Sequence, residues 1–95
     1  MAPIRRLVLD VLKPHEPPMV ELAQELVAVE GVDGVNMSLM EIDHEVENVK
    51  LTIEGAAIDY PDVRATIDGF GATIHSVDEL AVGDHLVEAG ETPQD

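Results

Sequence analysis

The 95-residue sequence contains no cysteine and no tryptophan, only one phenylalanine and one tyrosine, and 5 basic side chains against 20 acidic ones. Without cysteine the chain has no disulfide, thiolate zinc site, iron–sulfur cluster or thiol nucleophile. No apolar run is long enough to cross a membrane, and residues 1–13 lack the apolar core and cleavage site of a signal peptide. We therefore expect a cytoplasmic protein.

The scarcity of basic residues argues against nucleic acid and membrane surfaces as partners. Recognition of phosphates needs a basic stripe or cluster, and the few arginines and lysines are scattered along the chain. The formal net charge of −15 is tolerated best under strong screening, since the Debye length falls to about 3 Å at molar salt. The acidic excess therefore predicts adaptation to high salt, and it makes any single acidic cluster a weak indicator of a metal site.

The apolar residues are spaced regularly, which distinguishes this acidic chain from a disordered one. Hydrophobic residues make up 45% of it. A strand-like period of two occurs in four segments, and helical spacing occurs in residues 19–27, after two prolines, and in residues 60–69, after Asp59. The strand segments begin near Ile4, Val35, Val49 and Thr73. The order β-α-β-β-α-β predicts an α+β, ferredoxin-like fold, a four-stranded antiparallel sheet with two helices on one face.

The predicted domain covers residues 1–82. Residues 83–95 carry a short apolar patch followed by glycine, proline and acids, so we expect this tail to be poorly ordered alone and to dock on a neighbouring subunit.

The predicted topology brings acidic residues to one sheet edge, where the first strand ends and the second turns into the third. Calcium takes about six to eight oxygen ligands in irregular geometry, so this edge is a candidate site for a divalent cation. The predicted ligands are Asp10, Glu41, Asp43 and Glu47, with His75 beside them as an outer partner. Strict alternation directs Asp10 to the open face but Glu41 and Asp43 to the helix side, unless a bulge reorients them. Two alternatives stay open: screened surface carboxylates, and a pairing of Asp10 with Lys50.

The open face of the sheet is the predicted self-interface, because two helices cover only one face. By alternation it presents Val8, Met40 and Ile42 among ionic side chains, which is too apolar for an ordinary solvent face. The alternative is a mixed face that is simply exposed. At the opposite edge we expect Arg5 and Arg6 to pair with nearby carboxylates.

Several segments resemble one family. They are LVLDVLKPHEP (7–17), VNMSLMEID (35–43), NVKLTIEG (48–55), GATIHSVDEL (71–80) and TPQD (92–95). These segments, in this order, resemble the archaeal domain of unknown function 211. The resemblance implies a ferredoxin-like fold, ring-like homo-oligomers and divalent cations, calcium included, as ligands, and it implies no reaction. The acidic excess suggests a halophilic member.

Catalysis is poorly supported by the sequence. The only serines are Ser38 and Ser76, and no Gly-x-Ser-x-Gly elbow surrounds either. Acylphosphatases share the predicted strand order, but the loop KPHEPP lacks the glycine and arginine of their phosphate cradle. The open face also lacks the aromatic side chains on which RNA bases stack. We therefore predict a non-enzymatic, self-assembling domain; the alternative is a small-ligand sensor that binds at subunit junctions, near the glycine-rich turn at residues 31–34.

Overall fold

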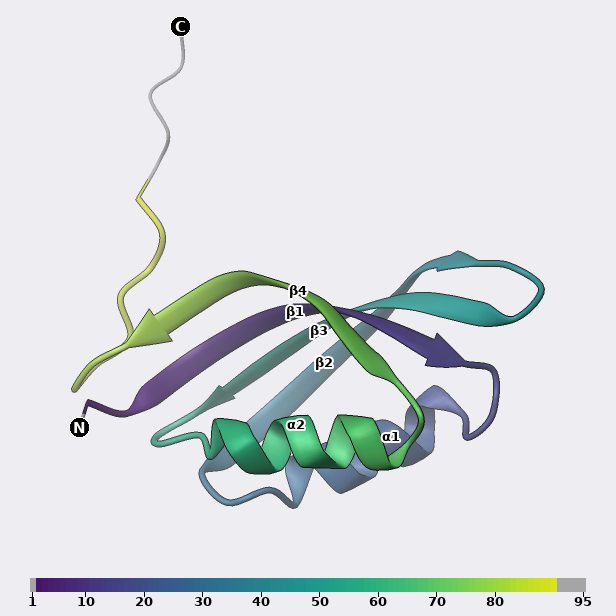
Figure 1. The fold of residues 1–95 in the computed structure, drawn as a ribbon. Helices are drawn as coiled ribbons and strands as arrows, with labels where there is room; N and C mark the ends of the chain where they lie inside the picture. Colours follow the sequence, from purple (N-terminus) through teal and green to yellow (C-terminus); the bar gives the residue numbers. More distant parts are fainter. Residues whose placement is uncertain (1, 91–95) are drawn as a thin grey trace, which may run out of the picture.

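A computed structural model describes residues 2–90 and shows an antiparallel sheet with both helices packed against one face (Figure 1). The elements are β1 (Ile4–Pro14), α1 (Met19–Val27), β2 (Val32–Ile42), β3 (Val46–Gly55), α2 (Tyr60–Gly69) and β4 (Thr73–Val82). The strands lie in the order β2-β3-β1-β4, and every neighbouring pair is antiparallel. The ferredoxin-like prediction is confirmed.

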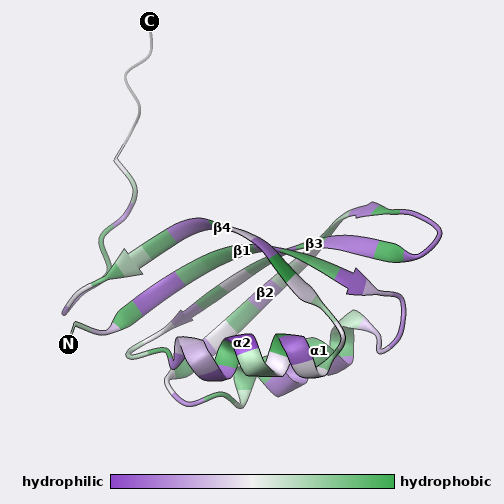
Figure 2. Ribbon diagram, in the orientation of Figure 1, coloured by the Kyte–Doolittle hydropathy of each residue, from purple (hydrophilic) through white to green (hydrophobic). Residues whose placement is uncertain are grey.

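The core lies between the helices and the two central strands. Alternate residues of β1 point toward the helices, and the same parity holds across β3, because directly paired residues of antiparallel strands share a face. Figure 2 shows hydrophobic and hydrophilic residues alternating along the strands. The buried side chains include Leu7, Leu9, Val11, Val49, Leu51 and Ile53 of the strands, and Leu22, Leu26, Val63 and Ile67 of the helices.

The predicted start of α2 is also confirmed. The Asp59 carboxylate accepts a hydrogen bond from the backbone N–H of Asp62 at 3.1 Å, and Pro61 occupies the first turn. The first backbone N–H groups of a helix have no partner within it; the Asp59 carboxylate supplies an acceptor for one of them, and Pro61 has no N–H that needs a partner.

A bulge in β2 changes which residues share a face. Leu39 lies opposite Val49, but the next pair is Glu41 with Asn48, so Met40 is an extra residue. Beyond the bulge Ile42 lies opposite Glu47, a helix-side position, although strict alternation placed it on the open face. Val8 does lie on the open face, but it is only 8% exposed. The expectation that Val8, Met40 and Ile42 form one surface is therefore wrong.

The ion pairs predicted at the other edge of the sheet form at Arg6, whereas the Arg5 guanidinium donates to the backbone carbonyls of Gly83 and Asp84 instead of to carboxylates. The guanidinium of Arg6 lies 2.7 Å from a Glu54 carboxylate oxygen and 3.0 Å from one of Glu79. It also binds Glu88, at 2.9 Å, so part of the predicted tail contacts its own sheet. These carboxylates raise the pKa of Arg6 above its ordinary value. Residues 91–95 of the tail lie outside the described residues.

Within residues 2–90 no helix is long and apolar enough to cross a lipid bilayer.

Candidate functional site

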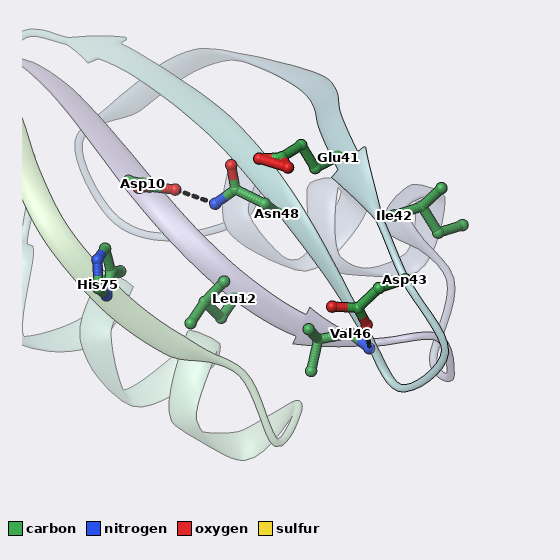
Figure 3. A pocket seen from close by; sticks show the side chains of 8 residues that line it. All are labelled: Asp10, Leu12, Glu41, Ile42, Asp43, Val46, Asn48 and His75. Atoms are coloured by element: carbon green, nitrogen blue, oxygen red, sulfur yellow. Dashed lines mark hydrogen bonds between the residues drawn. The ribbon is translucent and has the colours of Figure 1, made fainter.

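A cavity of about 370 Å³ lies at the sheet edge predicted for cation binding (Figure 3). Its lining comes from β1, the β2–β3 hairpin and β4. The lining residues are Asp10, Leu12, Glu41, Ile42, Asp43, Val46, Asn48 and His75. Three of the four predicted acidic ligands and the predicted histidine thus surround one space.

Asp10 lies in the middle of the sheet, between Lys50 on β3 and Ser76 on β4. Its carboxylate accepts a hydrogen bond from the side-chain N–H of Asn48, drawn as the dashed line beside Asp10 in Figure 3. A neutral amide therefore satisfies this carboxylate in part. Lys50 lies directly opposite Asp10 in the strand register, but the side-chain hydrogen bond to Asp10 comes from Asn48, so the alternative in which Lys50 pairs with Asp10 is not confirmed.

Glu41 reaches the same face as Asp10 because of the bulge. It lies opposite Asn48 on β3, and Figure 3 shows its side chain directed toward Asn48 while Ile42 points away. Strict alternation would have turned Glu41 to the helix side. The reorientation that the sequence left open is therefore realised at Met40.

Asp43 is hydrogen-bonded to backbone groups within its own hairpin. Its carboxylate oxygen accepts hydrogen bonds from the backbone N–H groups of Glu45 and Val46, both at 3.0 Å. These donors hold the pKa of Asp43 below its ordinary value. Asp43 lines the cavity, but one of its carboxylate oxygens accepts the hydrogen bonds that close the turn, as aspartate commonly does.

Glu47 does not belong to the cavity, contrary to expectation. It lies opposite Lys13 on the helix side of the sheet, two residues before the buried Val49. Its carboxylate contacts the Lys13 Nζ at 3.3 Å and the His15 Nδ1 at 3.1 Å. The hydrogen bond from His15, followed by those from Lys13, lowers the pKa of Glu47. The reason is parity: only even-numbered residues of β3 face Asp10.

Lys13 is a partner that the sequence reading missed. Its side chain is fully buried, and its Nζ donates to the Pro14 carbonyl at 2.7 Å and to Glu47. The signal was present in the alternation Leu9, Val11, Lys13, which places the lysine in line with the core. A buried ammonium is stable only with such acceptors.

Apart from the second carboxylate oxygen of Asp43, the oxygens left for a cation are those of Asp10 and Glu41 and the side-chain carbonyl of Asn48. These are the hard ligands that calcium and magnesium prefer. Within the part of the chain that the structure describes, no three histidine, aspartate or glutamate side chains converge closely enough to hold a metal ion. Asp10, Glu41 and Asn48 of a single chain therefore do not form a complete coordination shell.

Fold and site together define a small ferredoxin-like α+β domain with an acidic cavity at one sheet edge. The model of the DUF211 family, described as "Uncharacterized ArCR", matches residues 5–95, and the chain belongs to this family. It is also similar to "Uncharacterized protein MJ0319" of Methanocaldococcus jannaschii, with 49% identity over 92 residues that cover 97% of this chain and 95% of that protein. The resemblance seen in the sequence is confirmed, and neither description names a reaction.

Proposed function

We propose that this protein is a non-catalytic, self-assembling domain whose copies join through the outer strands of their sheets, and whose acidic sheet edge binds divalent cations. The observation that carries the proposal is that both outer strands bear exposed apolar side chains on the same face. β2 and β4 are the outer strands, and each has an unpaired backbone edge.

The exposed apolar side chains stand on the helix-facing side of the sheet, because they lie opposite core residues of the central strands. On β2, Leu39 is 46% exposed and lies opposite the buried Val49. On β4, Val77 is 48% exposed and lies opposite Leu9, and Leu80 is 55% exposed. Placing β2 of one copy beside β4 of another would bring these side chains together and remove them from water.

The strand directions favour a head-to-tail arrangement. In the order β2-β3-β1-β4 the directions alternate, so β2 and β4 run in opposite directions. A second copy in the same orientation can therefore add its β4 antiparallel to β2. Such an interface uses two different surfaces and is repeated by each added copy, and it generates a ring where the rotation closes.

The cation proposal rests on Asp10, Glu41 and Asn48. Calcium takes about six to eight oxygens, so water or oxygens from a neighbouring copy must complete the shell. Asp43 and Glu47 are not part of this proposed site, because the hairpin amides hold the first and Lys13 and His15 hold the second. Assembly and cation binding are linked where a neighbouring copy supplies the missing oxygens.

The test of assembly compares charged substitutions on the two outer strands, β2 and β4. We expect Leu39→Lys and Leu80→Lys each to convert the oligomer to a smaller species, because each places a charge in a desolvated interface. The measurement is the mass by light scattering after gel filtration in molar KCl. Val20→Lys is the matched control, since Val20 is 69% exposed on α1 and lies on neither edge strand.

Circular dichroism of each variant separates dissociation from unfolding. An unchanged mass for both edge variants in their folded state contradicts the proposed interface. A wild-type protein that is monomeric in molar KCl contradicts self-assembly altogether.

A further inference from the structure

The imidazole of His15 joins the segment after β1 to the β2–β3 hairpin. Its Nδ1 lies 3.1 Å from a carboxylate oxygen of Glu47. Its Nε2 lies 2.9 Å from the backbone carbonyl oxygen of Asp43 and 3.1 Å from that of His44. One partly exposed ring therefore contacts both the start of β3 and the tip of the hairpin.

Every partner of this ring is a hydrogen-bond acceptor. A carboxylate and a carbonyl oxygen accept but cannot donate, whereas a neutral imidazole carries a proton on only one nitrogen. The neutral ring would leave one nitrogen lone pair facing an oxygen. Only the imidazolium form can donate from Nδ1 and Nε2 at the same time, so this geometry selects the protonated ring.

The charges around His15 favour the same form. Glu47 on β3 contacts the ring directly, and the Asp43 carboxylate on the hairpin adds a second negative charge. Lys13 on β1 opposes them but is itself paired with Glu47. The pKa of His15 is raised, chiefly by the hydrogen bond to Glu47 and then by the carbonyls of His44 and Asp43, against the opposing cost of burial.

We infer that His15 is a pH-sensitive clamp that fixes the β2–β3 hairpin to the segment following β1 when its ring is protonated and releases one of the two attachments when the ring loses its proton. The hairpin carries Glu41 and Asp43, which line the acidic cavity. The clamp therefore restrains the motion of the residues on that side of the cavity. This role depends on neither assembly nor cation binding.

The direction of the pH dependence follows from linkage. Because the folded state raises the pKa of His15, the stabilisation is complete below the ordinary histidine value of about 6.5 and is lost as the pH rises through the higher folded value. The hairpin should therefore become more mobile as the pH rises through the folded pKa of His15, while the core stays unchanged.

The test uses the full chain at constant high ionic strength. Nitrogen-15 NMR of the imidazole should show His15 titrating above the free-histidine value, with both nitrogens protonated at low pH. Amide hydrogen exchange, corrected for its intrinsic pH dependence, should show protection at Asp43 and Val46 falling several-fold across that titration. Amides of the core residues Leu9 and Leu51 should keep their protection.

Two variants separate a switch from a merely structural contact. His15→Gln has one donor group and no titration, so its hairpin protection should be low and independent of pH. His75→Gln, on the other side of the cavity, should retain the wild-type pH response. The clamp is overturned if His15 titrates at or below the free value, or if wild-type hairpin protection does not change across its titration.

Discussion

Lys13 is a charged residue at a position of β1 where the alternation of the strand requires a buried side chain. Its position in the alternation requires burial, and its side chain has no exposed surface. The ammonium group is retained because the Pro14 carbonyl and the Glu47 carboxylate accept its hydrogen bonds. The free-energy cost of burying the charge is thus offset only while both acceptors remain.

Lys13→Met should lower the free energy of unfolding by about 3 kcal/mol, because it removes one of the two cationic partners of the largely buried Glu47. Urea unfolding in molar KCl measures the change. The exposed Lys50→Met is the matched control and should change stability by less than about 0.5 kcal/mol. At a pH where His15 is neutral, the double variant Lys13→Met/Glu47→Leu should recover much of the loss, since neither member of the Lys13–Glu47 pair is left unpaired. Equal losses in the Lys13 and Lys50 variants would contradict this account.

At the scale of elements, two turns interlock at the end of the sheet opposite the cavity. The turn from α1 to β2 contacts the turn from β3 to α2, and the Asp59 N–H donates to the Glu30 carbonyl across them at 3.1 Å. Gly31 has a φ of +86°, and a Cβ there would lie 1.8 Å from the Ala57 carbonyl oxygen. The glycine is required both by the backbone conformation and by the approach of the second turn.

Gly31→Ala should therefore destabilise the protein by roughly 3 kcal/mol or more, since the clash is with backbone and neither turn can move independently. Gly34→Ala is the control, because a Cβ at that position meets nothing within 4 Å. Thermal and urea unfolding of the two variants should separate them clearly. Two variants of equal stability would show that the turns are not locked together.

At the scale of the whole molecule, the net charge of −15 opposes both folding and assembly when screening is weak. The five basic residues are too few to neutralise this charge, and one of them, Arg6, already forms ion pairs with three carboxylates. In the proposed assembly, repulsion between copies should be stronger still, because each added copy adds its own negative charge. The halophilic origin suggested by composition stays a prediction, and the response to salt is its direct consequence.

Lowering KCl from molar to millimolar concentration should reduce the melting temperature and dissociate the proposed oligomer. Adding calcium chloride at constant high ionic strength should raise the melting temperature above its value in KCl alone, because specific binding stabilises the folded state. Asp10→Asn should abolish the calcium effect and keep the KCl effect, whereas Glu25→Gln on α1 should keep both. A calcium response that survives Asp10→Asn removes Asp10 from the proposed site, and one that is equal in every variant indicates screening alone.

The periodicity of the sequence determined the element order, the helix-facing residues of β1 and β3 and the Asp59 cap, because these depend on local spacing and local hydrogen bonds. The tertiary structure decided the rest. Whether Glu41 reaches the face of Asp10 depends on the bulge at Met40, which follows from the pairing of two strands. The meeting of Lys13, His15 and Glu47 likewise depends on the register of β1 against β3 and on the path of the chain after Pro14. Contacts between residues more than thirty positions apart are set by packing and register, and spacing along one chain carries no direct record of them.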